Sequence, residues 1–306
     1  MKKTYQTKAD AKINLFLRCC GKYPNGYHRL YMLMQQIDLG DDITVELDDG
    51  RGFDIEIESG VGIPREKDLG YKAAKAFYDA LELKLGEEAA KSFPYTFIKQ
   101  VKNVPSQAGL GGGSSDAASV LKVLQEHFNN PLTEQELLSI SAKLGADVPF
   151  FLYGGTCICE GVGEIVTKLP SLTGMPLILV KPDVGVGTKE CYELSDESNT
   201  PFDEEGYKEL MSSFFEDEGR SPAERIAAAA ASLTNDLQDP AIKIAPVIRD
   251  LIGAIERTGP LYCAMTGSGS CVFGIYENEF LRDGALAVLK NDPLVSGCKL
   301  IPSVMV

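Results

Sequence analysis

Histidine is scarce in this sequence, and its cysteines are not arranged as metal ligands. His28 and His127 are the only histidines, and no two of the eight cysteines have CxxC spacing. Structural zinc sites need closely spaced Cys and His ligands. The sequence therefore disfavours such a site, and we identify no metal-ligating residue from it. We interpret the cysteines as small buried hydrophobes that are kept reduced.

Positive charge and long apolar runs are also in short supply. Lys and Arg number 30 against 44 Asp and Glu, which gives a net charge of −14 without a separate basic patch. Such a surface repels a nucleic-acid backbone. No uncharged run of about 18 residues is present for a membrane span, and the opening MKKTYQTKADAK lacks the apolar segment of a secretory signal. These features predict a cytoplasmic protein whose partners are neither nucleic acid nor membrane.

What the sequence does contain is enough apolar material for two ordinary domains. Its 306 residues are 44% hydrophobic. In the first half, alternating apolar and polar residues predict strands, and apolar stripes that follow Asp or Thr caps predict helices. The expected elements are a strand at 10–17, a hairpin of strands at 43–49 and 53–59, a helix after Asp68, a strand at 95–101, a helix from about Ser114 to Phe128 with a stripe of Ala117, Leu121, Leu124 and Phe128, and a helix with a Thr133/Glu136 capping box that ends at Gly145.

The second half has the element order of a split βαβ or ferredoxin-like layer. We place the main boundary near Gly161, which gives domains at 1–161 and 162–306, and we interpret the acidic stretch 194–206 as a loop insertion. The expected elements are a strand at 176–182, helices around 207–215 and 223–233, strands at 261–265 and 271–276 joined by TGSGS (266–270), a helix at 280–290 and a strand at 298–306.

Residues 107–119, QAGLGGGSSDAAS, concentrate glycine between an expected strand and an expected helix. A Walker A loop needs Lys after its last glycine, and a dinucleotide fingerprint needs a third glycine; Ser114 stands at both positions, so both motifs fail. Convergent backbone N–H groups at a helix N-terminus still favour an anion. Ser115 could serve a phosphate oxygen or Mg²⁺. The alternative is a glycine-rich turn with a Ser cap.

The glycine run resembles the second motif of the GHMP kinase superfamily. CAMTGSGSCVFGIY (263–276) is similar to the third motif of that superfamily. Three further segments resemble the kinases of 4-diphosphocytidyl-2-C-methyl-D-erythritol within it. These segments are AKINLFLRCCGKYPNGYHRL (11–30), LGADVPFFLYGG (144–155) and EGVGEI (160–165).

This resemblance implies a two-domain α+β fold and a reaction. The fold has an N-terminal ribosomal-protein-S5-like domain that binds ATP, a C-terminal ferredoxin-like domain, and the active site in the cleft between them. The implied reaction transfers the γ-phosphoryl group of ATP, with Mg²⁺ bridging the phosphates, to the 2-hydroxyl of 4-diphosphocytidyl-2-C-methyl-D-erythritol in the non-mevalonate route to isoprenoid precursors. The implied partner is thus a small molecule, for a monomer or homodimer.

The resemblance also assigns residues to roles. Asp147 becomes the catalytic base, although by itself it could cap the next helix, and Lys12 would hold Asp147 ionised and favour the developing alkoxide. The expected ATP-binding residues are Lys102, Pro105, Gly109, Leu110, Gly111, Gly112, Gly113, Ser114 and Ser115. The expected substrate-binding residues are Asn14 at the erythritol hydroxyls, Tyr27, His28 and Tyr192 around the cytosine, Thr188 beside them, and Gly267 and Gly269 at the substrate phosphate.

Three alternatives stay open at this point. Another GHMP kinase would take homoserine or a mevalonate derivative as acceptor, but Tyr27, His28 and Tyr192 argue against it. A catalytically silent nucleotide-binding protein would not need both Lys12 and Asp147. A dinucleotide-dependent oxidoreductase is weakened because the fingerprint spacing is missing.

Overall fold

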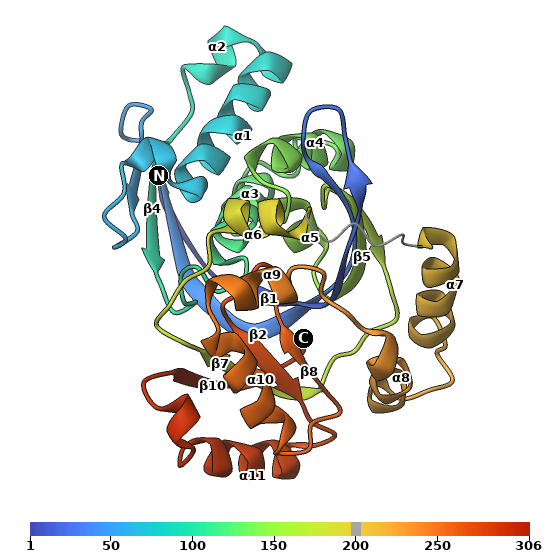
Figure 1. The fold of residues 1–306 in the computed structure, drawn as a ribbon. Coiled ribbons are helices and arrows are strands. Elements are labelled where there is room, and N and C mark those ends of the chain that lie inside the picture. The colour runs from blue at the N-terminus through green and yellow to red at the C-terminus, as the bar shows by residue number, and fades with distance from the viewer. Residues whose placement is uncertain (197–202) are drawn as a thin grey trace. The chain divides into compact units, whose positions relative to one another are not determined.

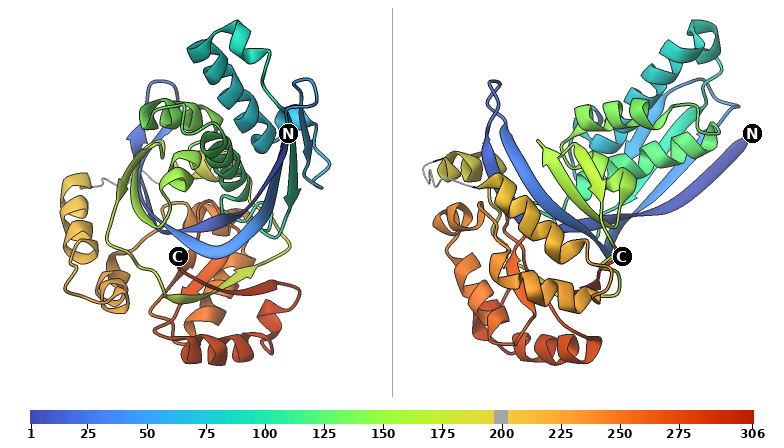
Figure 2. Two further views of the ribbon diagram at one scale, coloured as in Figure 1. Left: turned by 180° about the vertical axis from the view of Figure 1, so that it is seen from behind. Right: turned by 90° about the vertical axis from the view of Figure 1, so that its right-hand side faces the viewer.

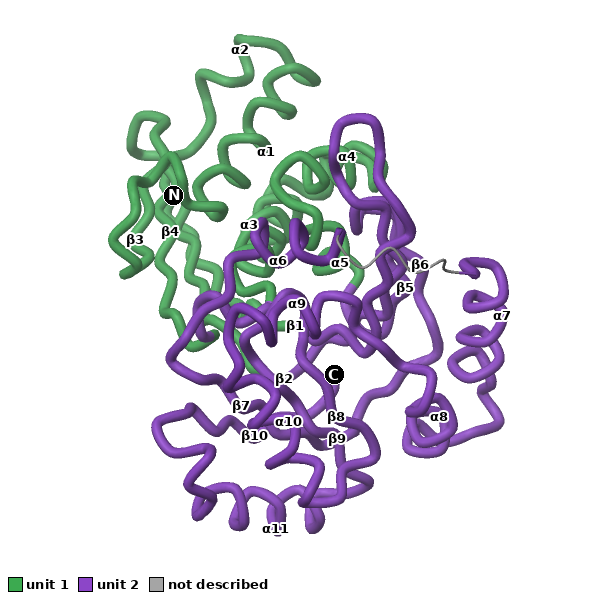
Figure 3. Tube along the Cα trace, viewed as in Figure 1, with its two compact units in different colours: residues 1–11, 39–104, 111–153 green, residues 12–38, 105–110, 154–306 purple. Residues whose placement is uncertain are grey.

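The computed structural model describes residues 1–196 and 203–306, which fold into two compact units (Figure 3). Strands β1 (Lys2–Lys22) and β2 (His28–Asp48) contribute to both units, because the division falls within each strand. The units are therefore discontinuous in sequence, and the expected boundary near Gly161 stays a prediction. Unit 1 comprises residues 1–11, 39–104 and 111–153, and unit 2 comprises residues 12–38, 105–110 and 154–306.

A mixed sheet in unit 1 corrects one expectation. Strand β4 (Tyr95–Val101) lies between β2 and β3 (Ile55–Glu58), antiparallel to β2 and parallel to β3. The predicted hairpin of 43–49 with 53–59 was therefore wrong. Helix α1 (Leu69–Leu85) follows β3 and leads the chain to β4, so β3 pairs through a parallel crossover connection and not through a tight turn.

Helix ends in unit 1 lie where their capping residues predict. The Asp68 side chain accepts a backbone N–H at the start of α1, at 2.8 Å. Thr133 and Glu136 form a capping box at the start of α4 (Glu134–Leu144), and Gly145 follows its last residue. Local side-chain chemistry is thus sufficient to set these boundaries.

Helices α1 and α3 (Gly112–His127) pack against each other in the core of unit 1 (Figure 2). The stripe predicted on α3 is confirmed for Ala117, Leu121 and Leu124, which are fully buried, whereas Phe128 is half-buried. The remaining elements of unit 1 are η1 (Arg65–Lys67), α2 (Glu87–Ala90) and α5 (Val148–Tyr153).

Unit 2 contains a hairpin on β2 and a separate antiparallel sheet. Residues of β2 pair with β5 (Thr156–Gly161), which pairs with β6 (Ile165–Lys168). The separate sheet has the order β10-β7-β9-β8, which is that of the predicted ferredoxin-like layer. The class and this layer are therefore confirmed. Its strands are β7 (Pro176–Lys181), β8 (Tyr262–Met265), β9 (Val272–Ile275) and β10 (Lys299–Val304).

Helices α10 (Val247–Glu256) and α11 (Glu279–Leu289) pack on this sheet (Figure 1). Helix α10 packs on β8 and β9, and α11 packs on β10 and on β7, whose residues are all buried. Of the stretch 194–206, expected as a loop insertion, residues 197–202 lie outside the described residues. The other elements of unit 2 are α6 (Thr188–Ser195), α7 (Glu204–Phe215), α8 (Pro222–Ala229), η2 (Ala230–Ser232), α9 (Gln238–Ile244) and η3 (Pro293–Val295).

All eight cysteines are free thiols. Four are buried and four are half-buried, so the expectation of buried cysteines holds for half of them. Burial raises the pKa of Cys157 and of Cys191 to about 11, which keeps both thiols protonated and unreactive. Within the described residues, no helix combines the length and apolar character needed to cross a membrane.

Candidate functional site

The glycine run opens helix α3 in unit 1. Gly111 adopts a left-handed backbone (φ 73°) as the N-cap, and the helix begins at Gly112, two residues before the expected start. Ser115 is buried and its Oγ donates to Asp10 O at 2.7 Å, which fixes the first turn to β1. Gly113 is exposed. The first turn of α3 therefore has one anchored face and one open face, and its free N–H groups favour an anion.

Asp147 lies in the short connection between α4 and α5, within unit 1. Its side chain is half-buried. A Cβ atom built on Gly145, two residues earlier, would lie 3.8 Å from Ser114 Oγ. Because α5 also packs against α3, the segment that carries Asp147 adjoins the first turn of α3. Unit 1 thus places the candidate base near the candidate phosphate site.

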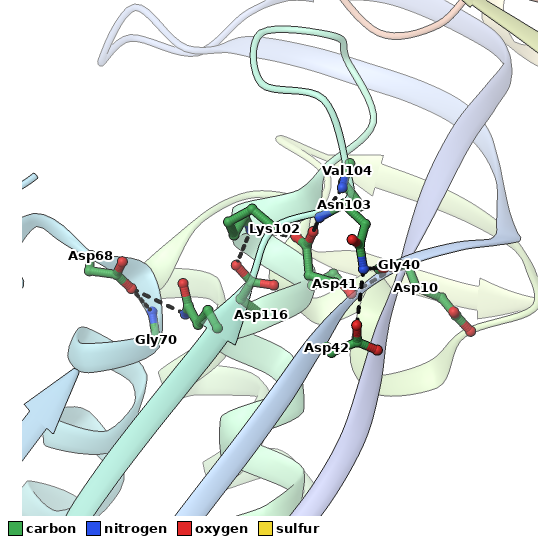
Figure 4. Close-up of polar contacts among 12 residues, drawn as sticks. Asp10, Gly40, Asp41, Asp42, Asp68, Gly70, Lys102, Asn103, Val104 and Asp116 are labelled. Atoms are coloured by element: carbon green, nitrogen blue, oxygen red, sulfur yellow. Dashed lines mark hydrogen bonds and ion pairs between the residues drawn. The ribbon is translucent and has the colours of Figure 1, made fainter. Parts of the chain in front are cut away.

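Lys102 is held between two carboxylates, one of which lies on α3 (Figure 4). Its Nζ donates to Asp41 and to Asp116, which is on α3. Asp41 also accepts the backbone N–H groups of Asn103 (2.6 Å) and Val104 (2.8 Å). The lysine therefore joins the end of β4, the strand β2 and the helix α3. Its expected contact with ATP stays a prediction.

Burial dominates the electrostatics of this cluster. It raises the pKa of Asp116 to about 7, against the opposing influence of Lys102. At Lys102 burial would lower the pKa, but the two carboxylates prevail and raise it above its ordinary value. Asp116 Oδ1 is buried and has no hydrogen-bond partner among the described residues, which adds to the cost of ionising this carboxyl group. Lys102 is thus the cation that compensates two buried carboxyl groups.

Replacing Lys102 by Met should destabilise the protein by about 3–5 kcal/mol at about pH 8, because two buried carboxylates would lose their cation. In the native state Asp116 keeps its proton up to about pH 7, whereas in an unfolded chain it loses the proton near pH 4. Between these two pH values the native state binds more protons, so the free energy of unfolding rises as pH falls. Lys102→Met should therefore lose less free energy of unfolding at about pH 5.5 than at about pH 8. Urea unfolding at both pH values measures it.

Lys99 provides the matched control, because it lies on β4, three residues before Lys102, but on the surface. Its Nζ is 3.5 Å from Glu58 Oε1, and both side chains are at least half exposed. Lys99→Met should cost little at either pH. If both Lys→Met variants lost the same free energy of unfolding, the cluster around Lys102 would make no special contribution to stability.

In unit 2, Lys12 and Asn14 are buried side by side on β1. Lys12 is 3% exposed and Asn14 is 1% exposed, and Lys12 Nζ donates to Asn14 Oδ1 at 2.6 Å. A lysine on a strand would ordinarily face solvent, so its residue type alone does not predict this burial. A buried ammonium group needs polar partners, and Asn14 is one of them. The alternation that puts these two residues on one strand face is confirmed.

The 266–270 turn packs directly on the first part of the glycine run. Asn14 N donates to Thr266 Oγ1 at 3.0 Å, and Thr266 Oγ1 donates to Gly109 O at 3.3 Å. A Cβ atom on Gly109 (φ 73°) would lie 2.1 Å from Thr266 O, and one on Gly267 would lie 3.5 Å from Lys12 Nζ. Only glycine permits this approach. Unit 2 therefore brings Lys12, Asn14, Gly109 and Gly267 together, while the roles expected for them stay predictions.

A second group in unit 2 surrounds His28. Its ring stacks on Tyr192 (centroids 4.6 Å apart), and its Nε2 lies 2.8 Å from Asp196 Oδ1. Burial would raise the pKa of Asp196, but hydrogen bonds from Lys22 and His28 lower it. Tyr27 is 64% exposed. His28 and Asp196 also line a cavity of about 980 Å³ in this unit.

The remaining predicted residues lie in several places. Thr188 begins α6, and its Oγ1 is 3.0 Å from Ser268 Oγ in the turn that contains Gly269. Pro105 and Leu110 flank the first part of the glycine run in unit 2. Lys12 and Asp147 belong to different units, and their pairing stays a prediction. Among the described residues, no group of three or more His, Cys, Asp or Glu side chains could hold a metal ion.

Sequence reasoning missed several polar residues around these sites. Asp41 and Asp116 bind Lys102, Thr266 joins Asn14 to Gly109, and Asp196 binds His28. Asp116 was visible as the one charged residue of the glycine-rich motif at 107–119. The others carry no local signal, since each acts on a residue distant in sequence.

Two family models match the chain. The GHMP kinases N terminal domain covers residues 68–155, and the GHMP kinases C terminal domain covers residues 214–293. A 4-diphosphocytidyl-2-C-methyl-D-erythritol kinase of Acetivibrio thermocellus is 38% identical over 287 residues, which are 93% of this chain and 94% of that protein. The protein of that name from Desulfitobacterium hafniense is 39% identical over 92% of this chain and 91% of its own length.

Solved structures agree with these matches. A crystal structure of a 4-(cytidine 5'-diphospho)-2C-methyl-D-erythritol kinase is similar with a TM-score of 0.74 and 27% identity, over 98% of this chain and 99% of that chain. A homoserine kinase from Cytophaga hutchinsonii reaches a TM-score of 0.75 at 17% identity, over 100% and 96% of the two chains. At that identity the second match shows a shared fold only.

Proposed function

This chain belongs to the family of 4-diphosphocytidyl-2-C-methyl-D-erythritol kinases, and from that premise we propose its reaction in detail. The γ-phosphoryl group of ATP passes to the 2-hydroxyl of 4-diphosphocytidyl-2-C-methyl-D-erythritol, which gives the 2-phosphate and ADP. The step belongs to the non-mevalonate route to isoprenoid precursors. The geometry that supports this assignment best is the open first turn of α3 beside the segment of Asp147.

The first turn of α3 is the proposed phosphate site for ATP. Gly111, Gly112 and Gly113 leave the backbone N–H groups accessible, and Ser114 adds a hydroxyl. A helix N-terminus binds phosphate through N–H groups and its positive dipole end, so no lysine in the loop is required. Asp147 then accepts the proton of the attacking hydroxyl and aims its oxygen at the phosphorus.

Lys12 is the proposed source of positive charge for the transfer. Its buried ammonium group is held by Asn14 in unit 2, beside Gly267. In a site with little water, a fixed cation stabilises negative charge that develops on the reacting oxygens more strongly than it would in solution. Asn14, as a neighbour of that cation, would contact the hydroxyls of the erythritol moiety, and Gly267 and Gly269 would shape the substrate phosphate site.

Recognition of the cytosine is assigned to Tyr27, His28 and Tyr192, with Thr188 close by. Since Nε2 of His28 meets Asp196, its Nδ1 is left for the edge of the base. Tyr27 has an exposed ring that can stack on the base, and Tyr192 would supply the opposite face. Base stacking of this kind contributes about 1–3 kcal/mol per base, while the hydrogen bonds select cytosine.

Mg²⁺ is proposed to enter with the nucleotide. This ion needs only one or two protein oxygens when phosphates supply the rest. Ser115 was expected to supply such an oxygen, but its hydroxyl is buried and donates to Asp10 O on the anchored face of α3, so it does not fit that role. When bound, the ion neutralises charge on the phosphates. A cytoplasmic location is proposed as well, and the eight free thiols support a reducing compartment.

An acceptor assay tests the proposed reaction. With ATP and Mg²⁺, ADP release should require an acceptor, and kcat/KM should be at least about 100-fold higher for the cytidylyl substrate than for homoserine or mevalonate, because only it fills the aromatic site. A higher value for homoserine or mevalonate would assign the chain to another GHMP activity. Release of ADP without any acceptor serves as the blank.

A further inference from the structure

Residues Asn235 to Gln238, the NDLQ segment, hold one side of the 266–270 turn. Asn235 Nδ2 donates to Met265 O at 2.8 Å and to Gly267 O at 2.9 Å. Gln238 Oε1 accepts from Met265 N at 3.0 Å. Asn235 Oδ1 accepts a backbone N–H two residues further on, also at 3.0 Å. The amide of Asn235 is thus fixed in one orientation, with both donor hydrogens on the turn.

The same segment is tied to β1. Leu17 N donates to Thr234 O, and Asp236 N donates to Leu17 O, both at 2.9 Å. Asp236 Oδ2 accepts from Cys19 N at 2.8 Å and lies 3.3 Å from Arg18 Nε. Since β1 is also the strand that carries the proposed catalytic lysine, the NDLQ segment connects that strand to the turn.

The opposite side of the turn faces Lys12. Gly267 (φ 56°) and Ser268 are both buried, and among the described residues neither backbone N–H has an acceptor. The C=O and N–H of one peptide unit point in opposite directions. Holding Gly267 O on Asn235 therefore turns Ser268 N–H to the other side. Buried N–H groups are almost always paired, and consecutive free ones form an anion site.

We propose that Asn235 is a positioning residue for the phosphoryl transfer. It fixes the peptide between Gly267 and Ser268 so that the free N–H of Ser268 faces the phosphate oxygens next to Lys12, beside the free N–H of Gly267. This role rests on the proposed function, because it needs a phosphate to be bound at that place. Asn235 touches neither substrate nor nucleotide, and acts only through the turn.

Asn235→Asp tests the role with almost no change of shape. The carboxylate can still accept the N–H two residues on, but it has no hydrogens for the two turn carbonyls and repels them. We expect kcat to fall by about 10–100-fold, less than the loss of a direct donor because the N–H groups are displaced and not removed. The dissociation constant for ADP should stay within about threefold. Amide hydrogen exchange at 266–270 should become faster.

Two controls separate positioning from stability. Asn291 at the end of α11 makes the same kind of bond, to Ala287 O at 2.9 Å, and Asn291→Asp should leave kcat unchanged. Asp236→Asn keeps the bonds of Asn235 and loses the ion pair with Arg18. It should lower the melting temperature while kcat stays within about threefold. If Asn235→Asp does not fold, Asn235→Ser replaces it with the same readouts.

The outcomes are distinct. A kcat loss in Asn235→Asp without a matching loss in Asp236→Asn supports positioning, whereas equal losses, or a folded Asn235→Asp with wild-type kcat, overturn it. If the wild type does not phosphorylate the cytidylyl acceptor, the proposed function fails first. In that case amide hydrogen exchange still reports on the 266–270 turn. Unchanged exchange in Asn235→Asp would refute the claim that Asn235 holds this turn in place.

Discussion

Replacing Asp147 by Asn should lower kcat by about 10²–10⁴-fold, the range for loss of a positioned general base. The amide has the size of the carboxyl group but cannot take the proton of the attacking hydroxyl. Affinity for ADP should change by no more than about threefold, because the proposed phosphate contacts come from the first turn of α3. Steady-state ADP release and calorimetric titration with ADP measure the two quantities.

The comparison needs an Asp→Asn variant outside the site. Asp283 on α11 is 62% exposed, and within the described part of the chain its one ion pair is with a neighbouring arginine on the same helix, so Asp283→Asn should behave as wild type. A rate for Asp147→Asn within about tenfold of wild type would exclude it as the base. Asp147 would in that case act mainly by orienting the attacking hydroxyl, as a loose transition state allows.

Gly109→Ala should damage both folding and catalysis. The added Cβ would lie 2.1 Å from Thr266 O, a backbone atom that cannot move alone, and φ is 73°. Left-handed strain and overpacking together should lower the free energy of unfolding by about 2–4 kcal/mol. Since the turn at Gly267 packs on the same spot, its displacement should reduce kcat/KM by about 100-fold or more. Urea unfolding and steady-state kinetics test both effects.

Gly284→Ala is the control variant, and it should have the opposite effect on stability. Gly284 lies inside α11, and a Cβ atom there would meet no atom of the described residues within 4 Å. Gly284→Ala should raise the free energy of unfolding by about 0.5–1 kcal/mol through helix propensity alone, with unchanged kinetics. Wild-type kinetics in Gly109→Ala would mean that the turn and the glycine run move independently.

The sequence could predict local features of this fold, such as helix ends. It could not predict which strands pair with each other. The caps at Asp68 and Thr133 depend on residues within one helical turn, so their signals are short in sequence. The strand 53–59 was recognised in part, but its pairing with β4 depends on the connection through α1, and the wrong hairpin followed. Alternation shows that a segment is a strand without showing which strand lies beside it.

The candidate site shows the same contrast between local features and contacts distant in sequence. The glycine run predicted a helix N-terminus for an anion, and α3 confirms that geometry. The roles of Lys12 and Asp147 came from resemblance, because no spacing connects residues so far apart. The bonds of Lys102 to Asp41 span 61 residues, and those of Asn235 to the turn span about 30. Such contacts exist only once the chain has folded, so they leave no periodic pattern.

The division of β1 and β2 between the units has a consequence for the order of folding. Unit 2 needs residues 12–38, which are synthesised early, together with residues 154–306. Gln35 Nε2 donates to Val306 O at 2.9 Å, a contact across 271 residues, and Ile37 pairs with Met305. Non-local contacts of this kind slow folding and leave apolar segments exposed during synthesis. On the ribosome, therefore, Gln35 and Ile37 on β2 must wait for Met305 and Val306 before these contacts can form.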